Sequence, residues 1–203
     1  TRDFANPGSD IFAENDHGAK VLSFMGVNIP FIMVGTAPEA DSWLLRSEDE
    51  DSEHLVEQDY WAAAVESADS VGVDIVNTSL GYSRFDDKSQ NYAYRNLDGK
   101  HALISRSAAM AAEKGIVVVN SAGNEGRKTW KKITPPGDAE NVLTVAALDS
   151  TLVNATFSSV GNTADGRLKP EVAAIGERTV VVGNNGNVTR ANGTSFSTPV
   201  LCG

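Results

Sequence analysis

The stretch ALISRSAAMAAEKGIVVVNSAGNEG, residues 102–126, decides the fold. A helical pattern runs from Ala102 to Lys114, and Gly115 is typical of the residue that follows a helix. The nearly continuous apolar run Ile116–Ser121 then predicts a strand that is covered on both faces. A helix that feeds such a strand is the repeating unit of α/β proteins with a parallel sheet.

The rest of the chain repeats this alternation. We expect further strands at Asp41–Arg46, Val73–Leu80 and Asn141–Leu148, and a helix at Glu53–Val71. The pattern therefore predicts an α/β fold with a mostly parallel, doubly wound sheet.

The last quarter of the chain has a different pattern. Val180–Val182 and Val188–Arg190 flank a turn rich in Gly and Asn, which predicts a β-hairpin, and a helix should begin near Ser195. Tyr82–Lys100 has no clear period, so we interpret it as a surface loop.

Composition excludes several classes of protein. The 203 residues suggest one domain, and the net charge of −10 argues against nucleic-acid binding, which needs clustered Lys and Arg. No apolar run approaches the roughly 18 residues that a membrane span requires. Cys202 is the single cysteine, so it has no partner for an internal disulfide.

One candidate for chemistry is Gly193-Thr194-Ser195-Phe196-Ser197-Thr198-Pro199. It delivers Ser195 to the first turn of a helix, where unpaired backbone N–H groups favour negative charge. A serine nucleophile suits this position, because the Ser195 N–H can bind the oxyanion that its own attack creates. The alternative is a helix cap without catalysis.

A serine nucleophile needs a base. Of the three histidines, His54 and His101 fit surface positions at helix starts. His17 precedes Gly18, whose small size would let another segment approach the imidazole, and apolar residues follow in helical register. A structural role at a helix start is the alternative for His17.

Asn124 follows the strand 116–121 in a loop framed by glycines. Ligands bind at the carboxyl ends of strands in doubly wound sheets, so its amide is placed to donate to an oxyanion. An asparagine in a left-handed turn is the alternative.

Together these motifs resemble the subtilase family, the subtilisin-like serine peptidases, from His17 to Cys202. His17-Gly18 with Val21 resembles the family's histidine helix, although Ala19 replaces the usual threonine. The serine motif, the loop Ser121-Ala122-Gly123-Asn124, and the connector made of residues 157–159 and 169–172 occur in the family's order.

The resemblance implies a three-layer α/β/α sandwich and a serine endopeptidase that acts on polypeptides. Ser195 would be the nucleophile, His17 the base and Asn124 the oxyanion donor. The walls of the substrate pocket would be Ser79, Leu80, Gly81, Ala122 and Gly123. No metal or other cofactor takes part in that chemistry.

One element of the family pattern is missing. The catalytic aspartate should precede the histidine in an Asp-Ser/Thr-Gly turn, but Asp3, Asp10 and Asp16 have no such turn. Asp3 instead resembles part of a later strand. We therefore expect residues 1–203 to be a partial catalytic domain, incomplete at both termini, which lacks the aspartate strand and later C-terminal elements and is nearly inactive. The alternative is a pseudoenzyme or peptide-binding module on the same scaffold.

Further expectations follow from this resemblance. Structural calcium occurs in many relatives, and Asp86, Asp87 and Asp98 are candidate ligands, although loop carboxylates in solvent are the alternative. Loss of an interior strand would expose a sheet edge for dimerisation. The family is usually secreted or in the cell envelope. The acidic run from Glu48 to Glu53 predicts basic residues before the cleaved bond, or else a solvated helix cap.

Overall fold

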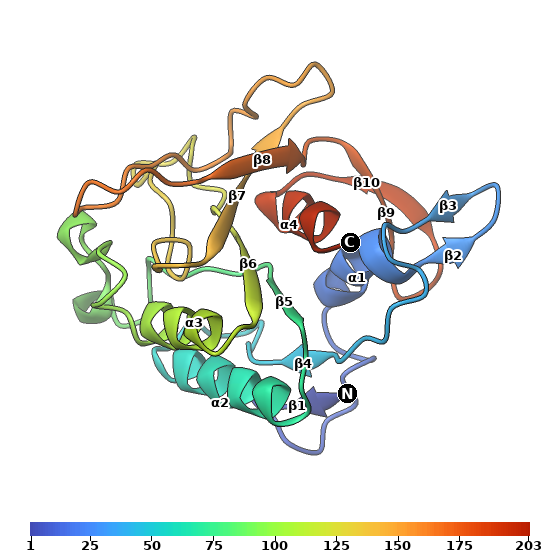
Figure 1. The fold of residues 1–203 in the computed structure, drawn as a ribbon, viewed down its shortest axis with the longest axis horizontal. Helices are drawn as coiled ribbons and strands as arrows, with labels where there is room; N and C mark the ends of the chain where they lie inside the picture. Colours follow the sequence, from blue (N-terminus) through green and yellow to red (C-terminus); the bar gives the residue numbers. More distant parts are fainter.

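Four parallel strands form the central sheet of the computed structural model, which describes residues 1–203 (Figure 1). Their order is β5-β6-β7-β8, with β5 at Ile75–Thr78, β6 at Val117–Ser121, β7 at Leu143–Leu148 and β8 at Val172–Ile175. The predicted strands 73–80, 116–121 and 141–148 are therefore confirmed, with shorter bounds. The strand at 172–175 was not predicted, because its polar and charged neighbours hide the apolar run.

A second, separate pair of parallel strands lies at one end of the molecule. It joins β1 (Arg2–Asp3) to β4 (Leu45–Arg46), and no strand hydrogen bonds connect it to β5. The strand predicted at 41–46 is thus reduced to its last two residues, and Asp3 lies in a strand as its sequence context suggested. β4 is an edge strand of this pair, and β5 is an edge strand of the central sheet.

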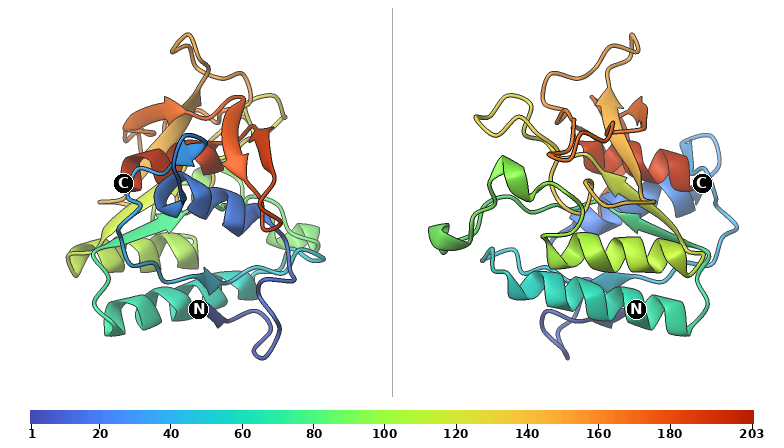
Figure 2. Two further views of the ribbon diagram at one scale, coloured as in Figure 1. Left: turned by 90° about the vertical axis from the view of Figure 1, so that its right-hand side faces the viewer. Right: turned by 60° about the vertical axis from the view of Figure 1, so that its left-hand side comes forward.

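Helices cover both faces of the central sheet. α2 (Val56–Ser70) and α3 (Leu103–Glu113) lie side by side on one face, whereas α1 (His17–Gly26) and α4 (Thr194–Cys202) lie on the other (Figure 2). This arrangement confirms the three-layer α/β/α sandwich. Gly115 follows α3 with φ +97°, as expected of a residue after a helix.

The interpretation of residues 82–100 as a surface loop was wrong. Tyr82, Phe85, Tyr92 and Leu97 are all buried, and the first three belong to the main apolar core under α2 and α3. The segment also contains two 3₁₀ helices, Lys88–Gln90 and Tyr94–Asn96. Four aromatic and aliphatic side chains without helical or strand spacing supply this burial, so periodicity could not reveal it.

Two hairpins complete the fold. β9 (Thr179–Val182) and β10 (Val188–Ala191) are antiparallel, which confirms the predicted hairpin. A short hairpin of β2 (Asn28–Ile29) and β3 (Met33–Val34) was not predicted. None of the helices combines the length and the hydrophobicity that crossing a bilayer would require.

Candidate active site

The N-terminus of α4 is bound to the loop that follows β6. The Asn124 side-chain oxygen accepts hydrogen bonds from the Thr194 N–H (2.9 Å) and from the Thr194 hydroxyl (3.1 Å). The Gly123 N–H in turn donates to the Thr194 hydroxyl (3.1 Å). Because the oxygen of the Asn124 amide is held by Thr194, its NH₂ group points away and is open to a ligand. The backbone φ of Asn124 is not left-handed, which removes the alternative explanation for this residue.

Ser195 is in the first turn of α4 and is linked to the end of β5. Its hydroxyl donates to the Ser79 carbonyl oxygen (3.2 Å), and the Ser79 hydroxyl donates to the Ser195 carbonyl oxygen (2.9 Å). Backbone N–H groups in the first turn of a helix have no partner within the helix. The Ser195 N–H is thus available beside the Asn124 amide.

His17 is the first residue of α1, and apolar contacts bring it to α4. Its ring lies 5.9 Å from the ring of Phe196, the residue after Ser195. Val21 packs with Phe196 and with Val181 of β9 in a small buried cluster. This cluster, and not a polar contact, holds α1 against α4. His17 is therefore next to the segment that carries Ser195.

The His17 imidazole has no hydrogen-bond partner in the protein. Burial lowers its pKa below the ordinary 6.5, Lys20 lowers it further, and Asp16 only partly opposes this. The neutral ring that results at pH 7 is the form that can accept a proton. A Cβ built on Gly18 would meet nothing within 4 Å, so no other segment of this chain packs against Gly18.

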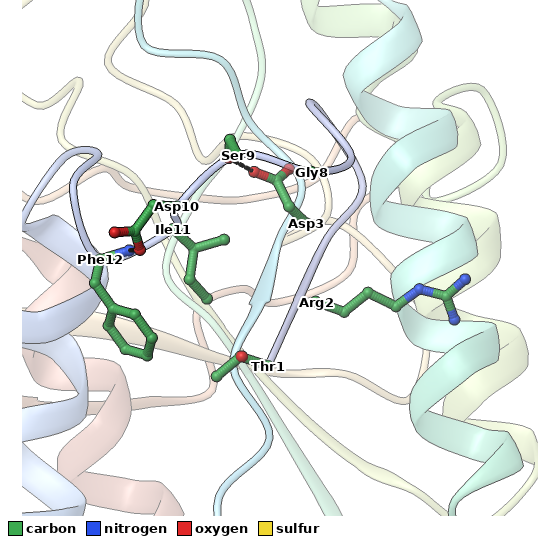
Figure 3. Close-up of a pocket in the computed structure, with 8 residues that line it drawn as sticks. All are labelled: Thr1, Arg2, Asp3, Gly8, Ser9, Asp10, Ile11 and Phe12. Atoms are coloured by element: carbon green, nitrogen blue, oxygen red, sulfur yellow. Dashed lines mark hydrogen bonds between the residues drawn. The ribbon is translucent and has the colours of Figure 1, made fainter.

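None of the three upstream aspartates forms a hydrogen bond or an ion pair with the His17 imidazole. The Asp3 carboxylate accepts hydrogen bonds from the hydroxyl of Ser9 (2.5 Å) and from Arg46 (2.8 Å), at the edge of a cavity of about 180 Å³ (Figure 3). Burial would raise the pKa of Asp3, but hydrogen bonds from the Asn6 N–H (2.8 Å), Ser9 and Arg46 outweigh it and lower the pKa. Asp16 forms an ion pair with Lys20 at 2.6 Å.

The third of these aspartates, Asp10, accepts a hydrogen bond from the Phe12 N–H (3.0 Å). Each of the three carboxylates thus has a local structural partner. The segments that carry the buried Ser195 hydroxyl, the oriented Asn124 amide and the His17 imidazole are neighbours, and no carboxylate hydrogen-bonds the imidazole.

The sequence profile described as "Subtilase family" matches residues 1–203, the whole chain. The chain belongs to the subtilase family. It is 32% identical to subtilisin DY from Bacillus licheniformis over 142 residues, which are 70% of this chain and 44% of that protein. A thermophilic serine proteinase from Bacillus sp. (strain AK1) is 28% identical over 99% of this chain and 44% of its own length. The chain therefore spans less than half of each of these relatives.

Solved structures show the same fold. The prenylagaramide maturation protease PagA superposes with a TM-score of 0.71 at 23% identity, covering 92% of this chain and 61% of that one. The patellamide maturation protease PatA gives a TM-score of 0.69 at 24% identity over 92% of this chain and 62% of that one.

The two predicted walls of the subtilase substrate pocket lie side by side at the ends of β5 and β6. The Ser121 hydroxyl donates to the Leu80 carbonyl oxygen (3.3 Å). The hydroxyl of Thr134 lies between the walls, because it would collide with a Cβ at Gly81 and stand 2.8 Å from a Cβ at Gly123. Glycine at both positions keeps the walls this close to Thr134.

The candidate calcium ligands of this subtilase do not converge. Asp87 accepts from Ser89, Asp98 accepts from the N–H groups of Lys100 and His101, and Asp86 accepts from the Glu53 N–H. No group of three or more His, Cys, Asp or Glu side chains is arranged to hold a metal ion. As they lie, these three aspartates do not fit a calcium ion.

The acidic run forms a cluster where α2 begins. Burial, and after it the negative charge of the neighbouring Glu57, raise the pKa values of Glu48 and Glu53 to about 7. Glu57 is buried and accepts from the His54 N–H (3.0 Å), so part of the cluster caps the helix. The buried hydroxyl of Tyr82 lies beside these carboxylates.

Sequence reasoning missed the positioning role of two residues. Thr194 binds Asn124 through both its N–H and its hydroxyl, and Ser79 exchanges hydrogen bonds with Ser195. In the sequence, Thr194 was seen only as part of the serine motif and Ser79 only as a pocket wall. A hydroxyl directly before the candidate nucleophile is the signal that could have identified Thr194.

Proposed function

We propose that this chain carries the nucleophile, base and oxyanion donors of a serine endopeptidase. The observation that supports this most is the bond between Thr194 and Asn124, which leaves the Asn124 NH₂ group and the Ser195 N–H free at the same helix end. Two such donors suit the oxyanion of a tetrahedral intermediate, for which one donor contributes about 3–4 kcal/mol.

In the proposed reaction the Ser195 oxygen attacks the carbonyl carbon of a peptide bond, and His17 takes the hydroxyl proton. The carbonyl oxygen, now negative, accepts hydrogen bonds from Asn124 and from the Ser195 N–H. Collapse of this intermediate breaks the C–N bond, and His17 gives the proton to the leaving amine. Water then attacks the acyl-enzyme by the same route and releases the free carboxylic acid. Ser79 to Gly81 and Ala122 to Gly123 would flank the substrate.

We also propose that the 203-residue chain alone has little activity. Nothing fixes the tautomer of His17 or stabilises its imidazolium, because the imidazole lacks a carboxylate partner. In subtilisin, loss of the triad aspartate lowers turnover about 3 × 10⁴-fold, which corresponds to about 6 kcal/mol. A similar deficit is expected here.

The experiment compares this chain with the full product of its gene on a quenched-fluorescent peptide library. The full product should hydrolyse peptides, and its Ser195→Ala variant should lose at least about 10³-fold in kcat/KM. Ser197→Ala, two residues along the same helix, is the matched control for the serine. Full activity in the Ser195→Ala variant would refute the proposed nucleophile.

A peptide-binding module is the second candidate function. It is favoured by one observation: the Ser195 hydroxyl is directed at the Ser79 carbonyl oxygen and not at His17. A binder would retain library peptides without cleaving them, and Ser195→Ala would leave their affinity unchanged. Turnover by the full product would exclude this reading.

Two accompanying proposals concern association and location. The unpaired edges of β4 and β5, with Ile75 43% exposed on β5, offer a place for a second copy to pair. Light scattering that gives a monomer at about 100 μM would contradict dimerisation of this chain.

Secretion or attachment to the cell envelope is proposed from family membership, and fractionation of the producing cells would test it.

A further inference from the structure

A second cavity lies on the face of the sheet opposite to His17 and Ser195. It has a volume of about 540 Å³ and lies between α2, the start of α3 and the two 3₁₀ helices, which are green at the left of Figure 1. The lining side chains that decide which ligand this cavity can bind are Asp59, Asn91, Arg95, Asn96, His101 and Arg106. None of these takes part in the proposed hydrolysis.

The wall formed by residues 91–96 presents hydrogen-bond donors. Asn91 and Asn96 each use the side-chain oxygen to accept a backbone N–H, from Phe85 (2.7 Å) and from Ala93 (2.8 Å). The oxygens are thereby fixed toward the protein, and both NH₂ groups are left for a ligand. The guanidinium of Arg95 forms neither a hydrogen bond nor an ion pair with the protein, so it adds a free cationic donor.

The opposite wall holds a second guanidinium in place. Arg106 donates from Nη1 to the carbonyl oxygens of Lys100 (3.0 Å) and His101 (2.7 Å), and its other nitrogens have no protein partner. His101 is fixed edge-on against the ring of Tyr92 at 5.7 Å. An arginine that is already oriented loses less conformational freedom when it binds a ligand.

The floor of the cavity is rigid. Gln58, which is 1% exposed, donates to the hydroxyl of Tyr92 (2.7 Å) and accepts from the Ile104 N–H (3.2 Å). Both polar ends of this buried amide are thus satisfied. The floor beneath the walls is therefore held by hydrogen bonds of its own.

The charge balance of the cavity is opposite to that of the protein. Two arginines and one carboxylate, Asp59, line it, whereas 27 acidic residues outnumber 17 basic ones in the whole chain. The paired N–H donors of a guanidinium group match the paired oxygens of carboxylates and phosphates. We propose that this cavity binds an oxyanion, the carboxylate or phosphate group of a small ligand, at Arg95 and Arg106.

Two-dimensional ¹H–¹⁵N NMR of the 203-residue chain tests the proposal. One arm adds inorganic phosphate and the other adds the acidic dipeptide N-acetyl-Glu-Glu-amide, each against sodium chloride at equal ionic strength. We expect saturable shifts that centre on the amides of Asn91, Arg95 and Arg106 in at least one arm. The arm that saturates at the lower concentration identifies the source of the oxyanion.

Variants decide whether the cavity is responsible. Arg95→Gln and Arg106→Gln should each weaken binding by about tenfold, because each removes charge-assisted hydrogen bonds. Arg190→Gln, on the exposed strand β10, is the control and should leave the affinity within about twofold. The spectra themselves report whether each variant is folded. Absence of saturable shifts in both arms, or equal weakening by Arg190→Gln, would overturn the proposal.

Discussion

The hydroxyl of Thr194 provides the most direct test of how the proposed oxyanion loop is held. Thr194 is fully buried, and its hydroxyl both donates to Asn124 and accepts from the Gly123 N–H. Thr194→Val keeps the shape of the side chain and removes both hydrogen bonds. The hydrogen bond from the Thr194 N–H to Asn124 is retained, so the loop should loosen and not detach.

The magnitude follows from these contacts. Each lost hydrogen bond costs about 1 kcal/mol net, and the Gly123 N–H is left without its partner. We therefore expect the free energy of unfolding to fall by about 2 kcal/mol. For a domain of this size, that corresponds to a decrease in Tm of roughly 4–8 °C.

Urea unfolding followed by tryptophan fluorescence measures the change. The midpoint should shift while the m value stays constant, because the surface exposed on unfolding is unaltered. Thr189→Val, at an exposed position on β10, is the matched control and should change stability by less than about 0.5 kcal/mol. Equal midpoints for the two variants would show that the Thr194 hydroxyl does not hold the loop.

Three other measurements test the electrostatics of the structure. Titration of His17 by NMR should give a pKa below 6.5. Lys20→Gln should raise that pKa and Asp16→Asn should lower it, and changes of the opposite sign would contradict the effect of these two charges on His17. Glu48 and Glu53 hold their protons more tightly when folded, so their contribution to stability is complete below about pH 4.5 and declines as the pH rises toward about 7. Glu48→Gln should flatten this decline when the free energy of unfolding is measured in urea at pH 4 to 8. An unchanged slope would refute the raised pKa of Glu48. Lys169 is 4% exposed, forms an ion pair with Glu171 (2.6 Å) and donates to the Val142 carbonyl oxygen (2.6 Å). Lys169→Met should therefore lower the free energy of unfolding by about 3 kcal/mol in the same assay, and a decrease below about 1 kcal/mol would count against a structural role.

Sequence patterns predicted the parts of this fold that have regular periodicity. The continuous apolar runs at 117–121 and 143–148 became interior strands, and the glycine-rich turn at 183–187 became a hairpin. The pattern failed at residues 82–100, because Tyr82, Phe85 and Tyr92 are buried from an irregular backbone. Burial that depends on tertiary contacts leaves no period in the sequence.

The candidate site was predictable to a similar extent. Motif order placed His17, Asn124 and Ser195 in one region, and the structure brings their segments together. The orientation of their polar groups was not predictable, because it depends on partners distant in sequence. Ser79 and Ser195, for example, are bonded across 116 positions of the chain.

The contact of Val21, Val181 and Phe196 has a consequence for how such a protein can evolve. Three apolar side chains from separate segments set the spacing between the imidazole helix and the serine helix. A methylene gained or lost on the β9 hairpin would therefore shift that spacing, although no polar group had been replaced. Mutations at Val181 can therefore change the distance between α1 and α4, and a comparison of polar residues alone would overlook them.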